Sequence, residues 1–369
     1  MRYNFDKVID RSGTSAEKVE GLKHIWGRTD LIPLWVADMD FATAPFVTDA
    51  IRKRCENEVL GYTGKPDSYY NAIINWVKQR YDLIVTKEVI NFVPGIVPGI
   101  GMAMNCFTQK GDKVMIQPPV YHPFAWVTTR NERTLVINPL KWENGMYRMD
   151  LDAFREQIKG CKLFILCNPH NPGGVVWTEA ELRAIADICY DEKVLVFSDE
   201  IHADLTLPPH THRPFATVSE KARMNSVTFM SPSKAFNMPG LSASHALIFN
   251  EDLRKRFRIY MDAGELDMGH VFAFLSVEAA YSHGTEWLDQ CLAYIQGNID
   301  FVDEFLKKHA PKIKAIRPEA SYLVWLDCRE LELSQKDLNE FFVDKAHLAL
   351  NDGEMFGKEG IGFMRLNVA

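Results

Sequence analysis

The chain has 369 residues, of which 47% are hydrophobic and 25% are charged, and its formal net charge is -7. This balance is typical of a soluble globular protein, and the length predicts two domains or one large domain with a smaller companion. The acidic excess and the lack of a basic stripe argue against nucleic acid as a partner, because phosphate binding needs a basic surface.

No run of 18 apolar residues could cross a bilayer, and the first residues contain no apolar segment of a secretory signal, so we expect no membrane partner. The seven cysteines form no CxxC and no paired Cys/His spacing. We interpret all of them as reduced core residues of a cytoplasmic protein. They are Cys55, Cys106, Cys161, Cys167, Cys189, Cys291 and Cys328.

Six short apolar runs predict strands. Each is apolar on both faces, which is typical of parallel strands that helices cover on both sides. Because longer amphipathic stretches alternate with them, we expect an α/β domain with a largely parallel sheet. The predicted strands lie at 88–93, 112–117, 133–139, 161–169, 193–200 and 225–231.

The segment 178–193 predicts a helix, because its apolar residues recur at helical spacing and Thr178 with Glu181 forms a capping-box pattern. After residue 285 the pattern changes to a long helical stretch, two strands around a turn at 318–321, and a last strand in GIGFMRLNV. This order predicts a second, α+β domain that the N-terminal segment joins.

Polar residues follow three consecutive predicted strands. Ligands in open α/β sheets bind beyond the carboxyl ends of the strands, so these residues are candidates for one shared cleft. They are Asn168 and Asn171 in NPHNPGG, Asp199 and His202 in SDEIH, and Ser231, Ser233 and Lys234 in SPSK.

Each group alone has a structural alternative. NPHNPGG has the composition of a solvent-exposed turn, Asp199 could form a salt bridge, and His202 could be a structural histidine. Lys234 alone could be an exposed lysine near a helix start. Together, however, a buried amine that faces a buried carboxylate is costly unless the protein uses it. The combination therefore favours a functional cleft.

Pyridoxal 5'-phosphate (PLP) is a cofactor that needs all of these groups. It takes a lysine amine, a carboxylate that keeps its pyridine nitrogen protonated, a donor to its 3'-oxygen, and a phosphate cup. The string FVPGIVPGIGMAM predicts a strand, a glycine turn and a helix, so the N–H groups near Ile96 and Val97 can face the phosphate. The string matches neither GxGxxG nor the P-loop pattern, so the nucleotide motifs are not met.

These strings carry a family resemblance over nearly the whole chain. NPHNPGG, SDEIHADL and SPSKAFNMPGL resemble the signatures of fold type I PLP-dependent enzymes, the aspartate aminotransferase superfamily. The strings LWVADMDF, GYTG, PPVYHPF and GFMRLN are similar to those of its cystathionine β-lyase branch, the MalY/PatB type of carbon–sulfur lyases.

The resemblance implies the PLP-dependent transferase fold, an α/β architecture. We expect a large PLP-binding domain at 46–280, with a mostly parallel seven-stranded sheet flanked by helices, and a smaller α+β domain formed by 1–45 with 281–369. Members of the family continue past a string such as RLN with a terminal helix. That helix is absent from this sequence, which leaves the packing of the small domain open.

The resemblance also implies roles for single residues. Lys234 would bind the cofactor and later move protons, Asp199 would pair with the ring nitrogen, and Tyr121 would stack on the ring, and these three are the implied catalytic residues. The implied cofactor-binding residues are Ile96, Val97, Tyr121, Asn171, Asp199, His202, Ser231, Ser233, Lys234 and Tyr62, and the implied substrate-binding residues are Arg365, Asn171 and Ala37.

Two of these residues carry further expectations. Tyr62 would reach the cofactor phosphate of a neighbouring subunit, so the resemblance implies a homodimer with a shared active site. Arg365 would hold the α-carboxylate of the substrate in a bidentate pair. Its alternative interpretation is a salt bridge on an edge strand.

The implied reaction is the β-elimination of cystathionine or related cysteine S-conjugates, which gives a thiol such as homocysteine, pyruvate and ammonia. An aminotransferase is the first alternative. Many aminotransferases of this fold carry an arginine where this sequence has Ser242 in GLSAS, and the lyase branch also lacks that arginine, which favours the lyase. A regulatory, partner-binding protein that keeps the PLP fold is the second alternative.

Overall fold

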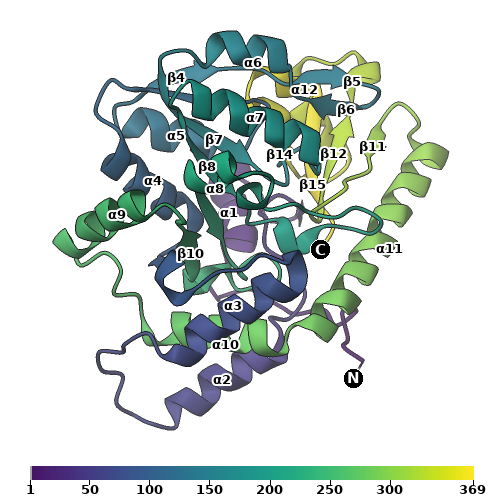
Figure 1. Ribbon diagram of the computed structural model, residues 1–369. Helices are drawn as coiled ribbons and strands as arrows, with labels where there is room; N and C mark the ends of the chain where they lie inside the picture. The colour runs from purple at the N-terminus through teal and green to yellow at the C-terminus, as the bar shows by residue number, and fades with distance from the viewer. Residues whose placement is uncertain (1) are drawn as a thin grey trace.

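The computed structural model describes residues 2–369, and a seven-stranded sheet forms its centre (Figure 1). Within the described residues, one strand of this sheet, β10, runs antiparallel to both of its neighbours, and the remaining pairs are parallel. In sheet order the strands are β2 (Ile90–Val93), β10 (Ser244–Leu247), β9 (Ser226–Met230), β8 (Leu195–Asp199), β7 (Cys161–Cys167), β3 (Lys113–Ile116) and β4 (Thr134–Ile137).

Helices cover both faces of the sheet, so the central strands are apolar throughout. In β7, Leu163 and Ile165 pack into one hydrophobic cluster, and Phe164 and Leu166 pack into another on the opposite face. The first cluster includes residues of α4 (Ile96–Phe107), α5 (Pro123–Arg130) and α9 (Glu251–Ala263), and the second includes residues of α6 (Leu151–Gln157), α7 (Glu179–Asp191) and α8 (Glu220–Met224).

The predicted helix at 178–193 is confirmed as α7, including its capping box. The Thr178 hydroxyl accepts a hydrogen bond from the Glu181 backbone N–H, and the Glu181 side chain accepts one from the Thr178 backbone N–H. A third hydrophobic cluster lies at the β2 end of the sheet and includes residues of α2 (Pro45–Cys55), α3 (Asp67–Tyr81), α10 (Val271–His283) and α11 (Thr285–His309).

A second, antiparallel sheet follows the long helix α11, at the upper right of Figure 1. Two shorter pairs accompany it: β1 (Ile32–Pro33) with β13 (Leu348–Ala349), and the hairpin β5 (Lys141–Glu143) with β6 (Met146–Arg148). The strands of the second sheet are, in order, β11 (Lys314–Ile316), β12 (Leu323–Asp327), β15 (Phe363–Asn367) and β14 (Asn351–Asp352), and the nearby helices are α1 (Glu17–Trp26) and α12 (Gln335–Glu340).

The pairing of β1 with β13 brings the N-terminal segment to the C-terminal part of the chain. The end of the chain is also docked there, because the Ala369 carbonyl accepts a hydrogen bond from the Asp40 backbone N–H. The division into 46–280 and 1–45 with 281–369 stays a prediction, since one hydrophobic cluster contains residues of both parts.

Three details differ from expectation. The strand predicted at 133–139 is β4, which lies at the sheet edge and is half-exposed rather than covered on both faces. The antiparallel strand β10 was not predicted. All seven cysteines are free, but Cys55 is exposed and Cys106 is half-buried, so the assignment of all seven to the core is wrong. No helix within residues 2–369 is long and apolar enough to span a membrane.

Candidate active site

The three strand ends that carry the predicted polar residues lie side by side, because β7, β8 and β9 are adjacent and parallel. A cavity of about 290 Å³ opens beyond them. Nine of the predicted site residues line it: Ala37, Ile96, Val97, Tyr121, Asn171, Asp199, His202, Ser233 and Lys234. The structure therefore brings together side chains that are up to 197 residues apart in the sequence.

Lys234 lies in the loop between β9 and β10, and its amine donates a hydrogen bond to the Ala37 carbonyl. Burial, together with the nearby positive charge of Arg365, lowers the pKa of Lys234 to about 8. Near neutral pH, roughly one amine in ten is then unprotonated, which is the form that attacks an aldehyde or accepts a proton.

Asp199 ends β8 and is buried beside the cavity. Its Oδ1 accepts a hydrogen bond from the Ile201 backbone N–H at 3.1 Å, yet burial raises the pKa of Asp199 to about 7. Buried His202 follows one turn later, and its Nδ1 has no hydrogen-bond partner. Burial lowers the pKa of His202 to about 3, so its imidazole is neutral. This carboxylate would be stabilised by a cationic ring nitrogen placed in the cavity.

The predicted phosphate cup is the start of α4. Gly95 is the N-cap with φ of 118°, a value that favours glycine, and no side chain caps the helix there. The backbone at Ile96 and Val97 lines the cavity, as does Ser233. Ser231 does not line it, because its hydroxyl donates to the Ala243 carbonyl at 2.7 Å and accepts from the Ser233 N–H. Ser231 thus shapes the loop between β9 and β10, which we call the lysine loop.

Arg365 lies in β15, between β12 and β14, and is 3% exposed. Its guanidinium donates to the Asn171 Oδ1 and the Trp35 carbonyl, each at 3.1 Å, and to the Asn351 side chain. Its Nε has no partner, and within residues 2–369 it forms no salt bridge. The alternative of an edge-strand salt bridge is therefore wrong: Arg365 is a buried cation without a carboxylate of its own.

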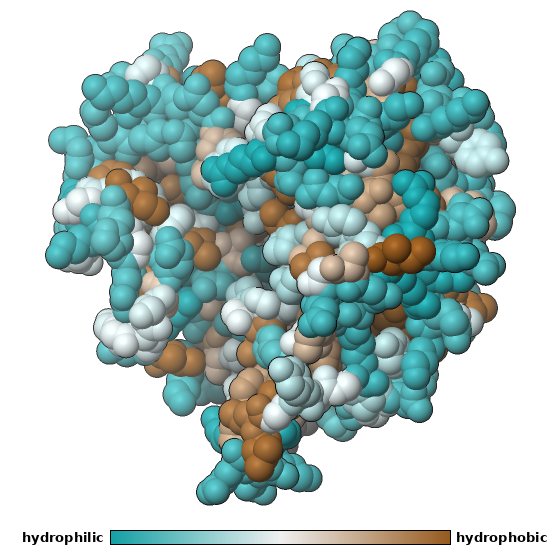
Figure 2. Space-filling model, turned by 90° about the vertical axis from the view of Figure 1, so that its left-hand side faces the viewer, coloured by the Kyte–Doolittle hydropathy of each residue, from teal (hydrophilic) through white to brown (hydrophobic). Residues whose placement is uncertain are grey.

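The two predicted tyrosines lie in different surroundings. Tyr121 lines the cavity, and burial raises the pKa of its hydroxyl, so it stays protonated. Tyr62 is 98% exposed and lies in the loop between α2 and α3, away from the cavity lining. That loop also exposes Val59 and Leu60. Figure 2 looks onto this side of the molecule and shows hydrophobic surface on the projection at the bottom of the view.

Several site residues were not predicted from the sequence. Cys167, Ile201 and Ser244 line the cavity, and Tyr322 donates its hydroxyl to the Ala37 carbonyl at 2.9 Å. Asn351 was missed because it lies on β14, a strand of two residues with no readable period. Its position opposite Arg365 follows only from the register of the sheet.

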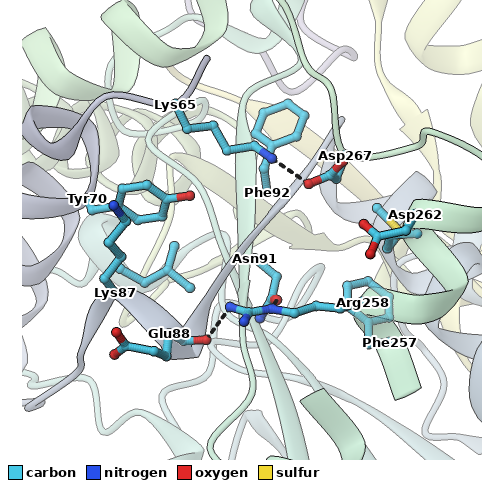
Figure 3. Close-up of a pocket in the computed structure, with 12 residues that line it drawn as sticks. Lys65, Tyr70, Lys87, Glu88, Asn91, Phe92, Phe257, Arg258, Asp262 and Asp267 are labelled. Carbon is cyan, nitrogen blue, oxygen red and sulfur yellow. Dashed lines mark hydrogen bonds and ion pairs between the residues drawn. The ribbon is translucent and has the colours of Figure 1, made fainter. Parts of the chain in front are cut away.

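A second cavity, of about 320 Å³, lies beside β2 and α9 (Figure 3). It contains none of the predicted residues. Its cationic side chains are bonded within the protein: Lys65 pairs with Asp267, and Arg258 donates to the Asn91 side chain and the Glu88 carbonyl. Its lining therefore lacks the combination of amine, carboxylate and uncapped helix end found at the first cavity.

The residues of the first cavity fit PLP. Lys234 supplies a partly unprotonated amine, Asp199 a buried carboxylate without a cation bonded to it, and α4 an uncapped N-terminus for a phosphate. The unpaired Nδ1 of His202 marks unsatisfied polarity at the same place. The roles of the single residues stay predictions.

Comparison with known proteins agrees with this fit. The family model "Aminotransferase class I and II" matches residues 29–369. The chain is 39% identical to the cystathionine beta-lyase PatB of Bacillus subtilis over 366 residues, which cover 99% of this chain and 95% of that protein.

Two solved structures are similar over the whole chain. A PLP-bound putative aminotransferase from Clostridium difficile 630 superimposes with a TM-score of 0.98 at 41% identity and is covered to 95%. A PLP-bound carbon–sulfur lyase from Staphylococcus hominis gives a TM-score of 0.91 at 36% identity and is covered to 94%. The expected fold, cofactor and resemblance are confirmed, and the chain belongs to the aminotransferase class I and II family of PLP-dependent enzymes.

Proposed function

We propose that this protein is a PLP-dependent carbon–sulfur β-lyase that acts on cystathionine or related cysteine S-conjugates. The observation that carries the proposal is Arg365, a buried guanidinium with no carboxylate partner, placed close enough to the Lys234 amine to lower its pKa. An amino acid bound by its carboxylate at Arg365 would present its Cα toward Lys234. The name of PatB, a lyase relative over the full length, supports the choice of reaction.

When bound, PLP supplies an electron sink that stabilises negative charge at the substrate Cα. Asp199 would keep the ring nitrogen of the cofactor protonated. The side-chain amide of Asn171 would donate a hydrogen bond to the 3'-oxygen of the cofactor, because its own oxygen already accepts one from Arg365. The start of α4 and Ser233 would bind the phosphate. Tyr121 would stack on the ring, and His202 would stay neutral beside it.

Lys234 would accept the proton from Cα, because its lowered pKa leaves part of the amine unprotonated at neutral pH. Loss of this proton allows the Cβ–S bond to break, and the sulfur takes a proton to leave as a thiol. With one water consumed, the net products are the thiol, pyruvate and ammonia. For cystathionine the thiol is homocysteine.

Transamination is the second candidate, since the similar Clostridium difficile protein is described as a putative aminotransferase. It uses the same proton abstraction at Cα and differs in where the proton returns. Ser242, which lines the cavity where many aminotransferases of this fold carry an arginine, supports the lyase.

We further infer a homodimer in the cytoplasm, with Tyr62 reaching the phosphate of the partner's cofactor. The exposed ring of Tyr62, in a loop that also exposes Val59 and Leu60, supports the dimer. The free state of all seven cysteines supports a reducing compartment.

The test is a comparison of two reactions of the purified PLP-loaded protein. One assay supplies cystathionine and measures pyruvate and free thiol, and the other supplies an amino acid with a 2-oxo acid and measures amino-group exchange. We expect equal amounts of pyruvate and thiol, with little exchange. Exchange without pyruvate would contradict the lyase and support the aminotransferase.

A further inference from the structure

Residues 35–40, which we call the strap, border the cavity at Ala37. Side chains from distant parts of the chain bind the carbonyl oxygens of the strap one after another. Arg365 donates to the Trp35 carbonyl at 3.1 Å, and Lys234 and Tyr322 both donate to the Ala37 carbonyl. Asn367 donates to the Val36 carbonyl at 2.6 Å and to the Asp38 carbonyl at 2.7 Å. Lys18 also donates to the Asp38 carbonyl, at 3.2 Å, and Asn237 donates to the Met39 carbonyl at 2.9 Å.

Two of these partners, Lys234 and Arg365, are the groups to which the proposed function assigns the chemistry and the substrate carboxylate. Both donate to the strap, at carbonyls two residues apart. Since a hydrogen bond fixes a side chain only as well as its acceptor is fixed, the position of the strap governs where the amine and the guanidinium lie.

A cluster of charged residues holds the strap from its other side. Lys18, on α1, is completely buried, and its Nζ lies 2.9 Å from the Asp40 Oδ2 and 3.9 Å from the Asp38 Oδ1. Arg11 binds Asp38 through both terminal nitrogens, at 2.6 and 3.2 Å. The Trp35 Nε1 donates to the Lys18 carbonyl at 3.0 Å, so the strap and α1 are joined in both directions.

A completely buried lysine is rare, because an ammonium group loses its hydration there and needs replacement partners for its three donors. Lys18 finds a carboxylate of Asp40, the carbonyl of Asp38 and the nearby carboxylate of Asp38, all in the strap. An apolar side chain would fill the same space without this cost. The partners of Lys18 therefore indicate that it fixes the strap.

We propose that Lys18 is a positioning residue of the active site: its ammonium holds Asp38 and Asp40 so that the Ala37 and Trp35 carbonyls face Lys234 and Arg365. This inference rests on the proposed function for the roles of Lys234 and Arg365. Lys18 itself lines no part of the cavity, so it acts on the reaction through the strap.

The test compares Lys18→Met with wild type. Methionine keeps the apolar stem and removes the ammonium. The matched control is Lys78→Met, which removes an exposed lysine paired with Asp82 on helix α3. Asp40→Asn, at a half-exposed carboxylate, weakens the same contact with less risk to folding. Each protein is measured by hydrogen exchange of peptides covering 35–41, with and without PLP, and by kcat and KM for pyruvate formation from cystathionine.

We expect exchange in the strap to be at least 10-fold faster in Lys18→Met, in the cofactor-free protein as well, and kcat/KM to fall about 10-fold or more. Asp40→Asn should also speed strap exchange and lower kcat/KM, but by smaller factors than Lys18→Met. Lys78→Met should change neither strap exchange nor kcat/KM. Unchanged strap exchange in both strap variants would overturn the proposal, as would faster exchange with wild-type kcat and KM. If wild type forms no pyruvate, the proposed function fails, while strap exchange still reports on Lys18.

Discussion

Replacement of Arg365 by methionine should separate activity from stability, because this guanidinium is buried without an ion pair. Its three partners are neutral oxygens, on Asn171, Trp35 and Asn351. A cation held in this way is available to a substrate carboxylate. Methionine has a similar reach and no charge, so Arg365→Met removes the proposed carboxylate contact while it fills most of the space.

The loss of activity follows from the two charge-assisted hydrogen bonds of a bidentate pair. Each is worth about 1.5–3 kcal/mol, so the pair should contribute about 3–6 kcal/mol. At 1.4 kcal/mol per factor of ten, kcat/KM should fall roughly 100-fold to 20,000-fold. Arg365→Lys should recover only part of this loss, since an ammonium cannot form the planar fork.

Stability should change little. Burial lowers the pKa of Arg365 to about 10 from 12.5, so below pH 10 the folded state carries a penalty on the order of 3 kcal/mol for keeping the cation. Arg365→Met removes that penalty and leaves three oxygens without their donor, at about 1 kcal/mol each. These effects nearly cancel, so the free energy of unfolding should stay within about 2 kcal/mol of wild type.

The assays are pyruvate formation across a range of cystathionine concentrations, and urea unfolding of the same preparations. Arg317→Met, at an exposed arginine paired with Asp300, is the matched control and should change neither quantity. A wild-type kcat/KM in Arg365→Met would refute the carboxylate role. A loss of more than about 4 kcal/mol of stability would show instead that the guanidinium mainly supports the fold.

Three further predictions concern the cofactor side of the site. Lys234→Ala should abolish pyruvate formation together with the absorbance band that depends on the bond between the Lys234 amine and the cofactor, and a retained band of that kind would contradict the cofactor role of Lys234. Asp199→Asn should stabilise the cofactor-free protein. Because the folded pKa of about 7 lies above the unfolded value of 3.8, the penalty is absent below pH 4, grows between pH 4 and 7, and is fully present above, at about 4 kcal/mol at most. Urea unfolding at pH 4 and pH 8 checks this, and an equal gain at both would refute it. For the dimer, refolding equal amounts of Tyr62→Ala and Lys234→Ala together should restore about one quarter of wild-type activity. Half of the dimers are then mixed, and each mixed dimer holds one complete site of its two. No restoration would place Tyr62 outside its partner's site.

Much of the site could be predicted because parallel strands end at one edge of a sheet. Asn171, Asp199 and Lys234 each follow a short apolar run, and the adjacency of β7, β8 and β9 brings them to one cavity. The helix α7 was readable from its capping box, whose geometry depends on residues only three apart.

What could not be predicted depends on contacts between distant segments. The strand β10 reads SHAL, and its polar Ser244 and His245 are buried, the His245 ring against Tyr281 of α10. The surroundings of Arg365 depend on β14, two residues that become a strand only by pairing with β15. The proposed position of Tyr62 beside a cofactor depends on a second subunit, which no pattern within one chain encodes.

The antiparallel strand β10 also has a practical consequence for measurement. Because β9 and β10 are neighbours that run in opposite directions, the lysine loop leaves and re-enters the sheet at the same edge. The Ser231 hydroxyl closes the base of the loop by donating a hydrogen bond to the Ala243 carbonyl. The outer part of the loop lies beyond this contact. At Gly240, in that outer part, an added Cβ would meet no atom within 4 Å. With exposed Cys55 replaced, a fluorescent label attached through Gly240→Cys would sit six residues from Lys234 and should report cofactor loading.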